Sequence, residues 1–70
     1  MTLIEIAQIY TDLIKAENAI PESEFVAKDE LNALRTKYHQ MLMDKMREEK
    51  IEFTDRFEAM NIAFEMINRS

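Results

Sequence analysis

The chain is 70 residues long, contains no cysteine and no glycine, and carries a formal net charge of −5. Its length fits one domain, and a domain of this size buries only about 60 % of the surface that its unfolded chain exposes, so its stability margin is narrow. The absence of cysteine excludes disulfides and thiolate zinc sites, and the single histidine, His39, excludes a site built from several histidines. Close helix packing or self-association is therefore needed as compensation.

Charge and hydropathy indicate where the protein is expected to work. The first residues lack the basic start and unbroken apolar run of a signal peptide, and charged residues interrupt every apolar segment well before membrane-spanning length. Fourteen acidic residues stand against nine basic ones, which argues against the concentrated basic surface of a nucleic-acid-binding protein. We therefore expect a soluble cytoplasmic protein without membrane contact, for which nucleic acid is a disfavoured partner.

No stretch alternates with the period of two that a half-buried strand requires, so we predict an all-α fold. The first helix is expected over residues 2–19. Thr2 and Glu5 have the spacing of a capping box, which satisfies free backbone N–H groups at a helix start. Apolar residues fill about half of the circumference at about 100° per residue, and Pro21 disfavours helical geometry just before it. This pattern predicts an amphipathic helix that covers a core with one side.

A second, longer helix is expected over residues 22–49, with Ser23 as its N-cap. Acidic residues near its start and Lys45, Arg47 and Lys50 near its end suit the helix dipole. About 27 residues would give it a length of roughly 40 Å. Its expected core stripe has mostly three- and four-residue spacing: Ala27, Leu31, Leu34, Tyr38, Met41 and Leu42.

A third helix is expected over residues 54–69, capped by Thr54. Its apolar residues form two adjacent stripes that together cover about 220° of the helix, more than a single core needs. This helix therefore requires two neighbours, or one neighbour and another subunit. The fold predicted for residues 1–70 is a single all-α domain: a small three-helix bundle, built as an antiparallel helical hairpin with a long central helix, in a dimer.

The end of the second helix departs from its apolar pattern. Lys45 occupies the position of the next core residue, while Met43 and Met46 point in other directions. Three interpretations are open: a snorkelling lysine at the end of the core, an adaptable methionine-rich patch that binds another chain, and a break in the helix near residue 43.

Helix length favours the methionine-rich patch. The first helix, at about 18 residues and 27 Å, should end opposite residue 40 of the second, which leaves the methionine end least covered. A partner could bury this end together with the surplus apolar face of the third helix, either a second copy in a homodimer or a different protein with an amphipathic helix. The predicted partner interface consists of Met41, Met43, Met46, Ile62 and Met66.

Candidate catalytic and ligand-binding groups are few. His39 has no carboxylate three or four residues away and is expected to be a solvated or rim residue. Glu17 is expected to lean out into water, and the acidic residues of 48–52 point in different directions. Without glycine, neither common phosphate-binding loop can form. We therefore assign no catalytic residue, no cofactor and no metal site, and expect that the protein is not an enzyme.

The function expected from this pattern is that of a small non-enzymatic protein-interaction module. It would be an accessory or regulatory subunit that acts through an apolar, methionine-rich helical surface. One alternative is a nucleic-acid-associated regulator, either an acidic mimic of DNA or a DNA-binding protein. A second alternative is a structural assembly subunit.

Overall fold

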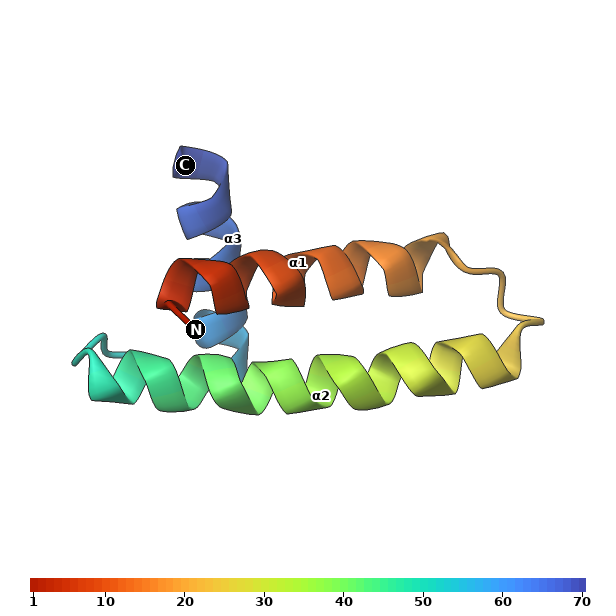
Figure 1. Cartoon of the computed structure of the whole chain (residues 1–70), viewed down its shortest axis with the longest axis horizontal. Coiled ribbons are helices and arrows are strands. Elements are labelled where there is room, and N and C mark those ends of the chain that lie inside the picture. Colours follow the sequence, from red (N-terminus) through yellow and green to blue (C-terminus); the bar gives the residue numbers. More distant parts are fainter.

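The computed structural model describes residues 1–70 and contains three helices: α1 (Leu3–Ala19), α2 (Phe25–Glu48) and α3 (Arg56–Arg69). α1 and α2 run antiparallel as a hairpin, and α3 crosses behind them near the start of α1 (Figure 1). The molecule measures 40 × 22 × 21 Å. The predicted all-α fold of three helices is confirmed. None of the helices combines the length and the apolar character needed to cross a bilayer.

α1 begins as its sequence predicts. The Thr2 hydroxyl accepts a hydrogen bond from the Glu5 N–H at 3.2 Å, and the Glu5 carboxylate accepts one from the Thr2 N–H at 2.8 Å. These bonds hold the pKa of Glu5 below its ordinary value. The capping box is confirmed, and a cap of this kind contributes about 1 kcal/mol to helix stability.

The other two helices begin later than expected. The Glu24 N–H donates to the Pro21 carbonyl at 3.0 Å, so Ser23 lies inside a turn and α2 starts after it, without a side-chain cap. α3 is capped by Asp55 instead of Thr54: the Asp55 carboxylate accepts from the Glu58 N–H at 2.9 Å. The Thr54 hydroxyl donates to the Glu58 carboxylate at 2.9 Å and so supports the same turn.

α2 ends in a Schellman motif without glycine. The Lys50 N–H donates to the Arg47 carbonyl at 3.1 Å, and the Ile51 N–H donates to the Met46 carbonyl at 2.8 Å. Lys50 has a φ of 60°, the left-handed conformation in which glycine is usual. A side chain in this conformation costs about 1–2 kcal/mol. The chain therefore reverses direction here at the expense of some backbone strain.

The core lies where all three helices meet, at the end of the hairpin opposite the turn (Figure 1). Ala59 and Ala63, one turn apart on α3, have no exposed surface, and their small side chains let α3 approach the hairpin closely. The Thr11 hydroxyl donates to the Gln8 carbonyl at 3.1 Å, which satisfies it inside the core. The buried residues are Leu3, Ile6, Ala7, Tyr10, Thr11, Leu42, Met46, Ala59 and Ala63.

The expectation that the far end of α2 is the least covered part of the molecule is wrong. Leu42 and Met46 are fully buried there. The connection of residues 20–24 starts α2 beyond the end of α1, as Figure 1 shows, so α1 does not stop opposite residue 40. Its first residue, Leu3, instead lines a shallow hollow together with Lys45. α2 is also continuous through residue 43, so the interpretation of a break there is wrong.

Candidate protein-interaction surface

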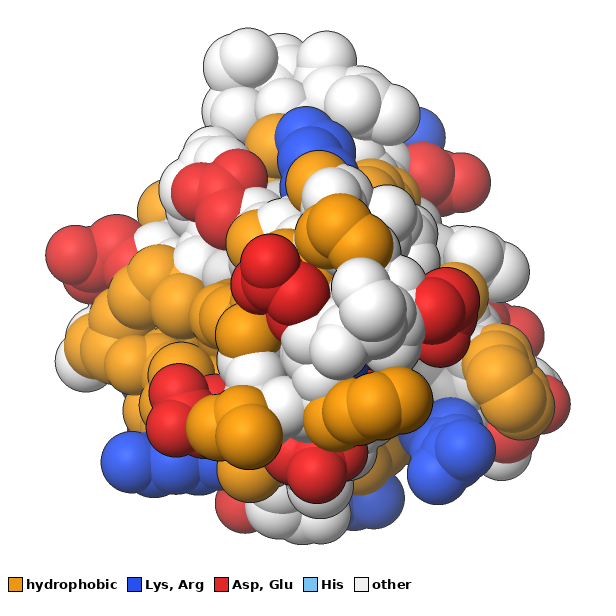
Figure 2. Space-filling view, turned by 90° about the vertical axis from the view of Figure 1, so that its right-hand side faces the viewer, with side chains coloured by type: hydrophobic (Ala, Val, Ile, Leu, Met, Phe, Trp, Pro, Cys, Tyr) orange, Lys and Arg blue, Asp and Glu red, His pale blue; other side chains and the backbone are white.

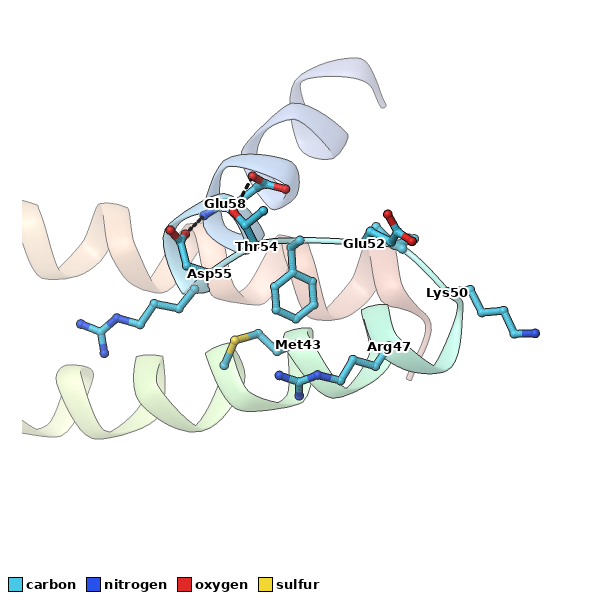
Figure 3. A pocket seen from close by; sticks show the side chains of 10 residues that line it. Met43, Arg47, Lys50, Glu52, Thr54, Asp55 and Glu58 are labelled. Atoms are coloured by element: carbon cyan, nitrogen blue, oxygen red, sulfur yellow. Dashed lines mark hydrogen bonds between the residues drawn. The ribbon is translucent and has the colours of Figure 1, made fainter.

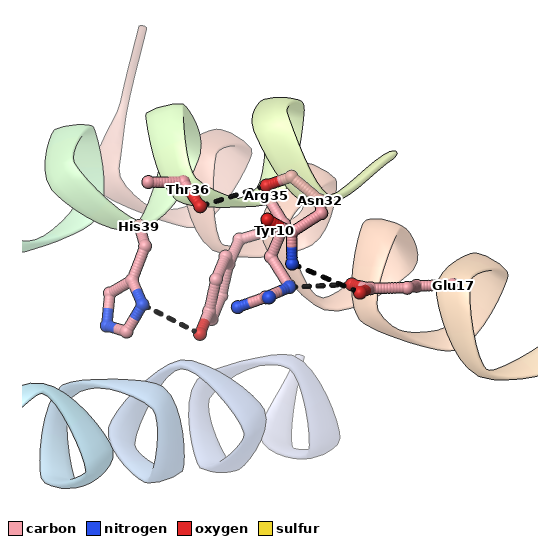
Figure 4. Close-up of polar contacts among 6 residues, drawn as sticks. All are labelled: Tyr10, Glu17, Asn32, Arg35, Thr36 and His39. Carbon is pink, nitrogen blue, oxygen red and sulfur yellow. Dashed lines mark hydrogen bonds and ion pairs between the residues drawn. The ribbon is translucent and has the colours of Figure 1, made fainter. Parts of the chain in front are cut away.

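A polar junction joins the three helices next to the core. The Tyr10 hydroxyl of α1 lies 3.2 Å from His39 Nδ1 of α2, and His39 Nε2 lies 3.0 Å from the Arg56 carbonyl of α3 (Figure 4 shows the Tyr10 contact). Because a carbonyl only accepts, Nε2 carries the proton and Nδ1 accepts from the tyrosine. His39 is therefore a half-buried residue at the rim of the core, bonded to two other helices, and only the expectation that it is solvated is wrong.

The junction is electrostatically suited to a neutral imidazole. Burial lowers the pKa of His39, and the nearby positive charges of Arg56 and Arg35 lower it further, against the opposing effect of the Arg56 carbonyl bond. Burial also raises the pKa of Tyr10, whose side chain is almost fully enclosed. Both groups are occupied by each other and by the backbone, so they hold the helices together and are not poised for proton transfer to a substrate.

A second polar contact ties the hairpin together nearer its turn. Arg35 Nε donates to the Glu17 carboxylate at 2.6 Å, and Asn32 Nδ2 donates to it at 3.4 Å (Figure 4). Burial tends to raise the pKa of Glu17, but these two bonds together with the positive charges of Arg35 and Lys28 outweigh it, and the pKa is lowered. Glu17 therefore lies between the helices instead of leaning out into water. The contact also fixes register, because Glu17 is level with Asn32 as Tyr10 is level with His39.

An open hollow of about 820 Å³ lies between the end of α2, residues 49–55 and the start of α3 (Figure 3). Several of its polar groups are already engaged within the chain, and the side chain of Lys50 points away from it. The Arg47 guanidinium binds Asp44 at 3.3 Å and lies 5.2 Å from the centre of the Phe53 ring. Asp55 and Glu58 are committed to the first turn of α3. No free set of polar groups converges on this hollow, so we do not assign a ligand site to it.

One side of the hairpin has no helix over it. α3 lies behind the hairpin in Figure 1, and the side toward the viewer is bare. Hydrophobic side chains gather into a patch on that same side, which is the left side of Figure 2. None of its residues is fully buried, and Leu34 is 45 % exposed. We call this side the open face. Helical spacing from His39, which bonds to α3, assigns to it Ile9, Leu13, Ile20, Leu31, Leu34 and Tyr38, of which Tyr38 also packs against the core.

The open face is built from two apolar stripes with a heptad-like spacing of three and four residues. The first stripe is Ile9, Leu13 and Ala16 on α1, with Ile20 just past its end; the second, on α2, is Ala27, Leu31, Leu34, Tyr38 and Met41. This spacing is typical of helices that pack lengthwise in bundles and coiled coils. The sequence predicted the α2 stripe as core, but only Leu42 of that predicted set is fully buried. The stripes extend well beyond the part of the hairpin that α3 covers.

The five predicted interface residues lie in different places. Met46 is fully buried and has no accessible surface in the isolated chain. Met41 and Ile62 are half-buried against the core, Met43 lines the hollow of Figure 3, and Met66 lines a separate hollow near the start of α1. Their assignment to a partner interface stays a prediction, but they do not form one continuous surface. Of the five, only Met41 belongs to a stripe of the open face.

Comparison with protein-family models, with curated proteins and with solved structures finds no match to this chain. The functional conclusion therefore depends on the surface of the molecule itself. The sequence contained one usable signal for the open face, the heptad-like spacing of both stripes. That spacing does not predict the path of α3, which decides which side of the hairpin stays uncovered.

Proposed function

We propose that this protein is a non-enzymatic protein-interaction module, an accessory or regulatory subunit that binds a helical partner through the open face. The observation that carries the proposal is the pair of long apolar stripes on a side of the hairpin that α3 leaves bare. Large exposed apolar patches on small proteins mark interaction sites. Two antiparallel helices with such stripes form half of a four-helix bundle.

The expected affinity follows from the partial burial of these side chains. Full burial of a leucine or isoleucine contributes about 1.5–3 kcal/mol. The residues of the open face are already partly buried within the chain, so a partner can add only part of this free energy for each of them. Association itself costs about 4–15 kcal/mol in lost freedom of motion. We therefore expect binding of moderate or weak affinity, suited to a partner that is exchanged or regulated.

Charge pairing supports a protein partner over nucleic acid. Ion pairs within the chain already occupy five of the nine basic side chains: Lys28, Arg35, Lys45, Arg47 and Arg69. Phosphate binding depends on free basic groups concentrated on one surface. No observation favours the two alternatives, a nucleic-acid-associated regulator and a structural assembly subunit.

The test is affinity capture from the source cell with the wild-type chain and two variants. Leu34→Glu places a charge in the open face, and Phe57→Glu places one on α3 at a side chain that is 61 % exposed. Both positions are exposed, so both variants should keep the helical content and melting temperature of the parent. Proteins retained by the parent and by Phe57→Glu but lost with Leu34→Glu would support the proposal. Equal capture by all three would reject it.

A further inference from the structure

We propose that the turn end of the hairpin is a second binding surface, which docks into an apolar pocket edged by basic side chains on another protein. We call this end the turn tip; it consists of residues 20–30, which form the connection between α1 and α2 and the start of α2. Two adjacent hydrophobic residues, Phe25 and Val26, are exposed there among acidic ones. Figure 2 faces this end of the molecule, and hydrophobic and acidic side chains lie next to one another on it.

Phe25 and Val26 are each 73 % exposed, more than any other large hydrophobic residue of the chain. α3 crosses the hairpin at its other end, so no helix covers them (Figure 1). Neither side chain therefore obtains within the chain the free energy that burial of apolar surface provides. The turn tip is also one end of the 40 Å long axis, so its side chains project from a convex end and fit a concave partner site. Aromatic anchors that fill such pockets carry much of the binding energy in protein interfaces.

The two side chains do not belong to the open face. At about 100° per residue, Phe25 lies about 180° around α2 from Leu34 and about 120° from Leu31. Val26 lies about 80° from Leu34 and about 140° from Leu31. A helix bound along the open face would leave Phe25 and most of Val26 uncovered. The turn tip is therefore a separate surface, and the proposal goes beyond the function proposed for the open face.

The charges of the turn tip identify the chemistry of its partner. Residues 20–30 contain four acidic residues and one basic residue, so this end carries −3 of the net −5 of the chain. All four acidic residues are exposed: Glu22, Glu24, Asp29 and Glu30. Lys28 lies 3.2 Å from Glu22, and the other three carboxylates form no ion pair within the chain. Three negative charges beside the hydrophobic pair are thus free to meet basic groups of a partner.

No basic residue of the rest of the chain neutralises this end. The hairpin register, in which Glu17 is level with Asn32, sets Lys15 and Arg35 about 14 Å and 15 Å farther along the helices than Phe25. Arg35 is also bound to Glu17. The negative charge of the turn tip therefore stays local.

This local charge disfavours the other classes of partner. Nucleic acids and anionic membranes are themselves negative and would be repelled. A zwitterionic membrane could accommodate the phenylalanine ring, but the carboxylates beside the ring would lose hydration without gaining partners. A second copy of this chain would present the same negative end. A protein pocket with an apolar floor and a basic rim satisfies both the hydrophobic pair and the charges around it.

The first experiment maps the contact by photo-crosslinking the full chain in the source cell. The photoreactive residue benzoylphenylalanine replaces Phe25, or, as a matched control, it replaces Phe57, which is 61 % exposed on α3. We expect a protein that crosslinks at position 25 and not at position 57, through a segment that contains apolar residues and an excess of Lys and Arg. Crosslinks to lipid or to a neutral or acidic protein segment, or the absence of a protein specific to position 25, would overturn the proposal.

The second experiment titrates the purified crosslinked partner with the chain and its variants. Phe25→Ser should weaken binding about 10- to 100-fold, because it removes the hydrophobic anchor. Glu24→Gln/Glu30→Gln should weaken it about fivefold, and the parental affinity should fall severalfold between about 50 and 300 mM salt, since exposed charge pairs are screened.

Leu34→Glu is the control that separates the two surfaces, and it should leave this affinity unchanged. All these variants alter exposed side chains, so circular dichroism should show the helical content of the parent. Binding that withstands Phe25→Ser, that does not respond to salt, or that is lost with Leu34→Glu would overturn the proposal of a separate acidic docking surface.

Discussion

The two ends of α2 differ far more in burial than in composition. At the end next to α3, Leu42 and Met46 are fully buried. At the turn end, Phe25 and Val26 are each 73 % exposed. Both ends belong to one continuous helix with apolar residues along its length. The difference comes from α3, which crosses the hairpin at only one end, so the burial of a side chain here depends on the helices around it more than on its own apolarity.

The largest expected effect tests this contrast directly with two leucines of the same helix. Leu42→Ala removes a fully buried side chain and should lower the free energy of unfolding by about 2–5 kcal/mol. Leu34→Ala removes one that is 45 % exposed and should cost no more than about 1 kcal/mol. Urea denaturation at low micromolar concentration measures both. Similar losses at the two positions would contradict the contrast between the ends.

An intermediate effect, of opposite sign, is expected where α2 ends. Lys50→Gly should raise the free energy of unfolding by about 1 kcal/mol, because glycine adopts the left-handed conformation without the side-chain penalty. Part of the gain is offset by the greater freedom of glycine in the unfolded chain. Lys50→Ala is the control, since alanine removes the lysine side chain but keeps the steric penalty. Equal stability of the two variants would show that the backbone strain is not what limits this turn.

The smallest expected effect is the pH dependence of the Tyr10–His39 junction. Burial lowers the pKa of His39 in the folded chain, whereas the unfolded chain titrates near the ordinary value of 6.5. Protons therefore bind the unfolded chain more readily, and stability should be full above about pH 7 and fall as the pH drops through 6.5 toward the lower folded pKa. Unfolding experiments at pH 7.5 and 5.5 should show this loss.

A matched variant separates His39 from the carboxylates. His39→Gln should remove the loss between pH 7.5 and 5.5, because glutamine does not titrate. Glu5 and Glu17 have lowered pKa values, so their contributions are lost only as the pH falls below their ordinary value of 4.5. A parent whose stability is the same at both pH values would show that the junction tolerates an imidazolium.

Local features of this fold could be predicted from the sequence, whereas relations between helices could not. The capping box of Thr2 and Glu5 depends on residues three positions apart, and it was predicted correctly. The position of α1 along α2 depends on the extended path of residues 20–24, which no periodic pattern encodes. That shift brings Tyr10 beside His39 and Glu17 beside Arg35, and it covers the methionine end of α2.

The candidate surface also combines a feature that the sequence could indicate with one that it could not. The sequence indicated more apolar surface than one small core needs and placed it on the third helix and near Met43 and Met46; that a partner uses this surface stays a prediction. The structure buries Met46 and leaves the leucine-rich side of the hairpin bare. The side that stays bare follows from the close approach of α3 through Ala59 and Ala63, two residues whose small size carries little signal in an amphipathic pattern.

The position of the core also has a consequence for the order of folding. The hairpin can form early, since its contacts are local and close a short loop. Its fully enclosed residues, however, lie only where α3 docks, so the hairpin alone has little to hold it together. α3 must therefore dock on α1 before a partly folded hairpin gains appreciable stability. We therefore expect single-exponential kinetics without a long-lived hairpin species, and a chain released from synthesis that becomes protease-resistant only once its final helix is complete.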